Sequence, residues 1–129
     1  MPLTTAAIAR LLEWGFTEES VTRPTTWYVA LFTAAPNVGG GGTEVSGGGY
    51  VREAVTFSRD GNVVANDAIV EWLPATASWG TITHGAVFDS ASGGVMLFFA
   101  ELPTAKTVGE NDIARISVGE LSNAIDPPV

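Results

Sequence analysis

His84 is the only histidine in the sequence and the first candidate for acid–base chemistry. A general base needs an acid that orients it and a site for its substrate. The nearest acid that follows it, Asp89, is five residues away and would point to the opposite face of a strand. On that strand His84 shares a face with three apolar residues, Ile82, Ala86 and Phe88. We therefore interpret His84 as a structural histidine and predict no catalytic residue.

Carboxylates are the second candidate, because calcium and magnesium ions prefer oxygen ligands. The stretch DGNVVAND, residues 60–67, is rich in oxygen atoms but lacks the spaced ligands and final glutamate of a calcium loop. A tight turn at its Asp-Gly-Asn start explains the pattern as well. Glu53 is expected to pair with an arginine such as Arg115, or to lie at a bulge. We predict no metal site and no cofactor.

A glycine-rich segment, residues 37–49, is the third candidate, with seven glycines between Gly39 and Gly49. A phosphate-binding loop needs a lysine after its glycines and a helix behind them. No lysine follows here, and the next segment has the pattern of a strand. The segment predicts a long, partly mobile connection in which Val45 is an anchor and Tyr50 begins the strand.

The elements that would position these groups begin with a helix over residues 3–15. Thr4 or Thr5 can cap its N-terminus, and Gly15 predicts its C-terminal stop. Because a helix of about three turns is marginal by itself, it must pack on the domain or on a neighbouring chain. The helical spacing i, i+3, i+4, i+7 is met by Ile8, Leu11, Leu12 and Gly15.

Behind the helix, about six to eight short apolar segments separated by turn residues indicate antiparallel strands. In the second of them, Val51, Val55 and Phe57 are expected on one face and Arg52, Thr56 and Ser58 on the other. We predict a mainly β fold, an antiparallel β-sandwich of jelly-roll or Greek-key type over residues 27–126. With the helix it forms a single domain of residues 1–129. The predicted strands are Trp27–Thr33, Tyr50–Ser58, Ala68–Pro74, Trp79–Ser90 and Val95–Leu102, then one bent strand or two short ones in the tail.

Composition excludes several classes of function. The net charge of −8 gives no electrostatic basis for binding nucleic acid or anionic membranes. The longest apolar runs are too short for a transmembrane helix, and the first residues lack the pattern of a secretory signal. No cysteine is present, so disulfides and thiolate chemistry are excluded. Charged residues make up only 16%, which indicates surface that is buried against partners.

The four tryptophans allow a carbohydrate-binding module as a rival function, because exposed aromatic rings stack on sugars. Trp27, Trp72 and Trp79 lie at strand starts or within apolar runs, so we expect them in the core. Trp14 ends the helix and is expected to anchor it to the sandwich or to a second subunit.

Several sequence segments, occurring in the same order, resemble those of a family of small phage tail fibre proteins, also described as virion structural proteins. They are WYVALFTAAP, GGTEVSGGGYVREAVTF, WGTITHGAVFDSASGGVMLFFAEL and KTVGENDIARISVGEL. The resemblance extends from about Leu3 to Ile125. It implies a non-enzymatic virion component, assembled in the host cytoplasm, that acts by oligomeric assembly and attachment to other virion proteins or the host surface.

By analogy with fibres, the resemblance also implies a homo-oligomer, specifically a trimer, with host-surface glycan as a further partner class. A capsid decoration protein that stabilises the phage head is an alternative, followed by the carbohydrate-binding module. An enzyme is the least favoured class. The residues expected to contact other copies or partners are Ile8, Leu11, Leu12, Trp14, Val45 and Tyr50.

Overall fold

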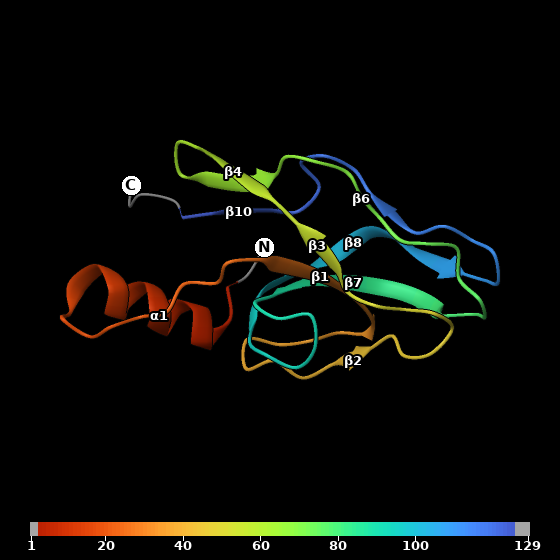
Figure 1. The fold of residues 1–129 in the computed structure, drawn as a ribbon, viewed down its shortest axis with the longest axis horizontal. Helices are drawn as coiled ribbons and strands as arrows, with labels where there is room; N and C mark the ends of the chain where they lie inside the picture. The colour runs from red at the N-terminus through yellow and green to blue at the C-terminus, as the bar shows by residue number, and fades with distance from the viewer. Residues whose placement is uncertain (1–2, 126–129) are drawn as a thin grey trace.

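The computed structural model describes residues 3–125 and contains one helix and ten strands in that part of the chain. Figure 1 shows the β layers side by side with the helix projecting at one end. The elements are α1 (Thr5–Phe16), β1 (Trp27–Ala34), β2 (Thr43–Glu44), β3 (Glu53–Val55), β4 (Phe57–Asp60), β5 (Val63–Asn66), β6 (Val70–Glu71), β7 (Gly80–Phe88), β8 (Met96–Val108), β9 (Arg115–Ile116) and β10 (Ser122–Ala124).

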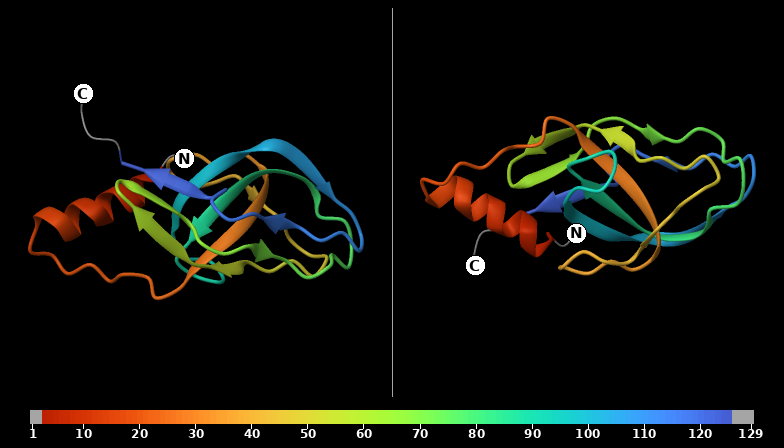
Figure 2. Two further views of the ribbon diagram at one scale, coloured as in Figure 1. Left: turned by 90° about the horizontal axis from the view of Figure 1, so that it is seen from above. Right: turned by 60° about the horizontal axis from the view of Figure 1, so that its bottom comes forward.

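The main sheet has the strand order β2-β1-β7-β8, and β3 also pairs with β1. All of these pairs are antiparallel. β7 and β8 form a hairpin closed by residues 89–95, where Asp89 accepts a 2.8 Å hydrogen bond from the N–H of Val95. Two smaller antiparallel sheets, β10-β5-β4 and β6-β9, lie on one side of the main sheet (Figures 1 and 2).

The main core fills the space between the large sheet and the two small ones. Trp72 and Trp79 are buried there, and their indole N–H groups donate 2.8 Å hydrogen bonds to the carbonyls of Val51 and Gly48. Both tryptophans are core residues as expected, since each has a buried ring and a satisfied polar atom. Other members from the two layers are Val29, Leu31, Val87, Phe98, Val70, Ile116 and Leu121.

A second, smaller cluster covers the opposite face of the main sheet, so β1 is buried on both sides. It contains Ala30, Phe32, Ala86, Phe88 and Met96. The expectation that Ile82 shares this face is wrong, because Ile82 packs in the main core. The register of β8 shifts by several residues where Ile82 pairs with Lys106 and His84 with Glu101. That irregularity breaks the simple alternation on which the expectation depended.

The predicted strand from Tyr50 to Ser58 is interrupted at Thr56, between β3 and β4. Val51 precedes β3 and is exposed whereas Val55 is buried, so the expected alternation does not extend to Val51. The side chain of Arg52, expected on the same face as Thr56 and Ser58, is only 8% exposed whereas those two residues are exposed. In this stretch, polar contacts to distant loops decide which side chains point inward.

The glycine-rich segment is a structured edge of the sheet and not a plain linker. It contains β2, which pairs with β1, and Asn37 forms an isolated bridge to Gly40. Gly48 has a φ of +60°, and a Cβ there would lie 2.8 Å from the Ala77 carbonyl and the Trp79 ring. Glycine is therefore required at Gly48 by both backbone conformation and space.

These observations confirm the predicted fold class, mainly β with antiparallel sheets in a sandwich-like arrangement and one N-terminal helix. The helix starts and ends later than residues 3–15, because Thr4 is its N-cap and it continues through Gly15 to Phe16. The tail was expected to form either one bent strand or two short strands, and it forms two short strands, β9 and β10. Residue 126, the expected end of the sandwich, lies outside the described residues.

Candidate functional site

The base of α1 is fixed to β8 through Thr4, which is buried. Its Oγ1 accepts a 3.2 Å hydrogen bond from the N–H of Ala7, as an N-cap does, and donates a 2.6 Å bond to the Met96 carbonyl. The Thr4 N–H donates to the Leu97 carbonyl at 2.9 Å. Ala7 is the only buried residue within the helix. The helix is thus joined to the sheet through its first turn.

Beyond that turn most of the helix is exposed, and its large exposed side chains are apolar. The helix positions expected to contact partners, Ile8, Leu11, Leu12 and Trp14, are all exposed in one chain. Trp14 is 65% exposed and Phe16, which follows it, is 85% exposed. Both views in Figure 2 show the helix extending away from the β layers. Large apolar side chains gathered on a projecting element are typical of an interaction surface.

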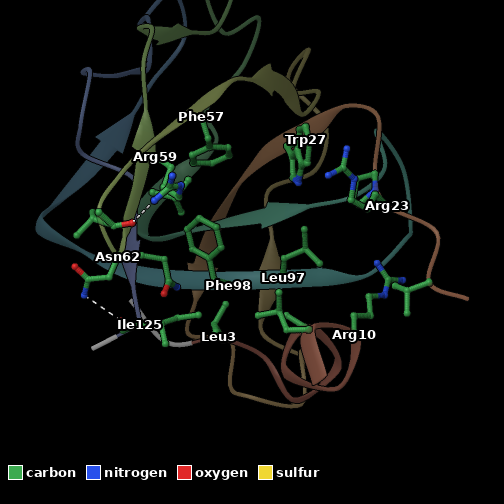
Figure 3. A pocket seen from close by; sticks show the side chains of 18 of the residues that line it. Leu3, Arg10, Arg23, Trp27, Phe57, Arg59, Asn62, Leu97, Phe98 and Ile125 are labelled. Carbon is green, nitrogen blue, oxygen red and sulfur yellow. Dashed lines mark hydrogen bonds between the residues drawn. The ribbon is translucent and has the colours of Figure 1, made fainter. Parts of the chain in front are cut away.

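A cavity of about 470 Å³ lies between the helix, the segment that returns from it to β1, the β4–β5 hairpin and the start of β8. This volume is within the range of roughly 300–1,000 Å³ that is usual for binding pockets. Figure 3 shows its side chains pointing toward a shared space. The lining is mainly apolar, with Leu3, Trp27, Phe57, Leu97, Phe98 and Ile125.

Three arginines, Arg10, Arg23 and Arg59, also line this cavity (Figure 3). They are half of the six basic residues in an acidic chain. Arg10 forms a 2.9 Å ion pair with Asp89, and Arg59 donates a 2.8 Å hydrogen bond to the Gly61 carbonyl. Within residues 3–125, Arg23 and Arg59 form no ion pair. The cavity therefore combines an apolar lining with positive charge that this part of the chain does not neutralise.

The ion pair at the helix is held in its charged form. Burial acts to raise the pKa of Asp89, but hydrogen bonds from the Val95 N–H and the Arg10 guanidinium outweigh burial and lower the pKa. The carboxylate thus links the second turn of α1 to the β7–β8 loop.

A second polar group lies in the body of the protein and joins the glycine-rich segment to the main sheet. Glu44 accepts bonds of 2.9 and 2.8 Å from the guanidinium of Arg52 and one of 2.7 Å from the Tyr50 hydroxyl. Arg52 also donates to the carbonyls of Ser90 and Gly93 and lies 3.7 Å from the Phe88 ring centroid. Its guanidinium therefore holds two loops on the smaller core cluster.

This arrangement shifts the pKa values of both Glu44 and Tyr50. Burial tends to raise the pKa of Glu44, but the hydrogen bonds from Arg52 and Tyr50 lower it below its ordinary value. For Tyr50, burial and the bond to the Glu44 carboxylate raise the pKa of the phenol. Charged Glu44 and neutral Tyr50 are the forms that the fold stabilises.

The structure places the six expected partner contacts in two separate groups. Ile8, Leu11, Leu12 and Trp14 lie on the exposed helix, and Leu11 also lines the cavity. Val45, by contrast, is 6% exposed and packs in the main core. Tyr50 packs edge-on against the Trp79 ring, with the centroids 5.5 Å apart. Val45 and Tyr50 thus make their contacts within the chain.

His84 bonds to its neighbour in sequence, with 2.8 Å between its Nδ1 and the Thr83 hydroxyl. Glu101 lies opposite it on β8, and no hydrogen bond joins His84 to an acid in the described part of the chain. Glu53 is not paired with Arg115, so that expected pair is wrong, because Arg115 forms a 2.6 Å ion pair with Glu71. The stretch at Asp60 is the turn of the β4–β5 hairpin. Among residues 3–125, no three His, Asp or Glu side chains come together as metal ligands.

Sequence reasoning missed Phe16, Arg23 and Arg59. Phe16 was excluded because Gly15 predicts a stop, whereas the helix continues to Phe16. Thr17 is its C-cap, and the Thr17 hydroxyl donates a 2.8 Å hydrogen bond to the Glu13 carbonyl. The arginines come from different segments, and no local pattern groups residues so far apart. The shortage of basic residues is the one signal that could have drawn attention to them.

A family model described as podophage GP4 fiber I protein gp80 matches residues 2–124. The chain belongs to this family. The match confirms the tail-fibre resemblance seen in the sequence, and it marks the chain as a virion component of the fibre type. Comparison with curated proteins finds no match.

The helix of this fibre-family protein has 12 residues. Over the described part of the chain, no helix combines the length and the apolar character needed to cross a bilayer.

Proposed function

We propose that this protein is a non-enzymatic structural component of a phage fibre that acts by assembling with copies of itself and with other virion proteins. The observation that carries the proposal is the apolar helix, which in a single chain exposes Trp14 and Phe16 to water. Exposed apolar clusters of this kind are costly unless another surface covers them. Membership in a fibre family supports a neighbouring virion chain as the covering surface.

The proposed assembly is a homo-trimer, by analogy with the threefold symmetry of fibres. Ile8, Leu11, Leu12 and Trp14 are its proposed contacts, and the glycine-rich segment is a rim element supported from inside by Val45 and Tyr50. The protein would be assembled in the host cytoplasm and reside in the virion. Attachment to host-surface glycan is a further role of the assembled fibre, since multivalency raises avidity.

Two observations favour a structural role over the rival classes. His84 forms a hydrogen bond with Thr83, and among residues 3–125 it forms none with an acid that could orient it. Trp72 and Trp79 are buried, so two of the four tryptophans that a glycan-stacking surface would use are occupied in the core.

The first experiment is to locate the protein on intact virions with a gold-labelled antibody or by cryo-EM density. Density at the tail is the expected result. Regular density over the head would replace the fibre role with capsid decoration, and absence from the particle would overturn both. Native mass spectrometry then tests the trimer, which should have three times the chain mass of 13.4 kDa. A chain that stays monomeric at all accessible concentrations would contradict self-assembly.

A further inference from the structure

The far end of α1 and the segment after it form a protruding surface of definite chemistry, here called the helix tip, residues 12–19. Its apolar side chains Leu12, Trp14 and Phe16 are at least half exposed. Its acids are Glu13, Glu18 and Glu19. Within the described residues none of these acids forms an ion pair. The helix tip is therefore an apolar knob that carries unneutralised negative charge.

The arginine-rimmed cavity beside the same helix carries the opposite charge to the helix tip, and its lining is apolar like the side chains of the tip. Trp27 and Phe57 belong to its apolar lining, and Arg23 and Arg59 add positive charge without a carboxylate partner in residues 3–125. Figure 3 shows Arg59 on one side of the cavity and Arg10 with Arg23 on the other. An occupant that satisfies this site needs apolar groups for the lining and carboxylates for the rim.

We infer that the helix tip of one copy docks into the arginine-rimmed cavity of a second copy. The inference rests on the proposed homo-oligomer and names the surfaces that form it. In this contact Leu12 and Phe16, four residues apart on one face of the helix, enter the apolar lining, and Glu18 and Glu19 pair with Arg23 and Arg59. Such aromatic and arginine residues are the types that dominate interface energies.

The contact joins two different surfaces, so each copy offers one tip and one cavity. A contact of this kind is heterologous, and it closes into a ring when the rotation between copies allows closure. A trimeric ring would use three equivalent contacts and leave no tip or cavity vacant.

Paired charge reversals test the docking directly by sedimentation equilibrium. Arg23→Glu with Arg59→Glu should weaken self-association at least about tenfold, and so should Glu18→Arg with Glu19→Arg. The chain with all four changes should recover association, because the reversed tip then meets a reversed cavity. All four positions are exposed, so thermal unfolding should be nearly unchanged in every variant. Failure of the fourfold variant to recover association, with its fold intact, would overturn the inference.

Cross-linking supplies a second readout, because the natural chain has no cysteine. Chains with Phe16→Cys are mixed under oxidising conditions with differently tagged chains carrying Val63→Cys, a cavity-lining position. A disulfide-linked pair with both tags should dominate, since a disulfide requires Cα atoms within about 7 Å. The matched control replaces Val63→Cys with Glu110→Cys, an exposed position in the turn after β8. Equal cross-linking to both positions would overturn the inference.

The outcomes separate this inference from the proposed function. If the charge reversals do not weaken association and cross-linking does not depend on the cysteine position, only the docking is overturned. The proposed self-assembly is then unaffected. Recovery by the fourfold variant, in a protein that antibodies do not find on virions, upholds the docking and overturns the fibre role. Weakening of self-association by Leu12→Ala with Phe16→Ala, about 30-fold or more, supports the docking as the contact that holds the assembly.

Discussion

The hydroxyl of Tyr50 donates a 2.7 Å hydrogen bond to the carboxylate of Glu44. The same hydroxyl accepts a 3.0 Å bond from the backbone N–H of Leu31 in β1. Glu44 lies in β2, in the middle of the glycine-rich segment, and Tyr50 follows the last glycine of that segment. One phenol therefore ties both ends of the second glycine cluster to the central strand of the sandwich.

Tyr50→Phe should lower the free energy of unfolding by about 1–3 kcal/mol, the range for a buried donor left without its partner. The ring can keep its packing on Trp79, so the lost energy would come from the N–H of Leu31 and the carboxylate of Glu44. Urea unfolding, monitored by tryptophan fluorescence, measures this loss in the free energy of unfolding. Tyr28→Phe is the matched control, and its effect should stay within about 0.5 kcal/mol. Equal losses in the two variants would contradict the role given to the Tyr50 hydroxyl.

The stability of the protein should fall on acidification in part because of Glu44. Its folded-state pKa is below the ordinary value of 4.5, so the unfolded chain takes up a proton first as the pH falls. The contribution of Glu44 is therefore complete above about pH 4.5 and is lost as the pH drops through the folded pKa. Glu44→Gln should be less stable than the natural chain at neutral pH, by roughly 1–3 kcal/mol. The difference in the free energy of unfolding between the two chains, measured with urea, should disappear under acid conditions.

Glu53 should behave in the opposite way and serves as the internal comparison. Burial raises its pKa, so the folded state binds the proton more tightly than the unfolded chain does. Its unfavourable contribution is present at neutral pH and disappears as the pH falls below the unfolded pKa. Glu53→Gln should stabilise the protein at neutral pH and have no effect in acid. Parallel pH profiles for the Glu44 and Glu53 variants would show that the signs assigned here are wrong.

Gly48→Ala should be far more damaging than Gly47→Ala, although the two glycines are adjacent and both have a positive φ. Each variant incurs a backbone cost of about 1–2 kcal/mol. A Cβ at Gly48 also collides with the Ala77 carbonyl and the Trp79 ring, whereas a Cβ at Gly47 meets open space. Overpacking adds about 1–3 kcal/mol to the Gly48 variant alone. Thermal unfolding of the two variants side by side gives the difference, and equal melting temperatures would refute it.

Thr4→Ala should loosen the helix without unfolding the sandwich. It removes the N-cap acceptor, worth about 0.5–2 kcal/mol, together with the hydrogen bond to the Met96 carbonyl. Amide hydrogen exchange should become faster along α1 while the strands keep their protection. Thr5→Ala is the control, because Thr5 is exposed and its only bond in this network comes from its backbone N–H, to the Val38 carbonyl. Unchanged exchange in α1 would show that Thr4 does not hold the helix.

Local pattern was sufficient for much of the fold. The apolar run from Trp27 to Thr33 differs from β1 by one residue, because aromatic and β-branched residues flanked by polar turns leave little choice. The N-cap at Thr4 was also among the predictions, since a threonine before an apolar helical pattern is a local signal.

What the sequence did not predict depends on contacts between distant segments. Arg52 was expected on one face with Thr56 and Ser58, yet it is held inside by Glu44 and by the carbonyls of Ser90 and Gly93. The cavity was not predicted for the same reason. Arg10, Arg23 and Arg59 come from the helix, the returning segment and β4, and only the packing of those elements brings them together.

The distal half of α1 contributes no residue to either core cluster, whereas Ala7 at its base is buried. Substitutions at Leu12, Trp14 or Phe16 should therefore be nearly neutral for the folding of an isolated chain. Under the proposed docking, natural selection acts on these positions through what they contact in a neighbouring copy. Among related phages, sequence variation at the end of this helix would then follow changes in the surfaces that it contacts. Variation at Ala7 would instead be limited by the stability of the fold.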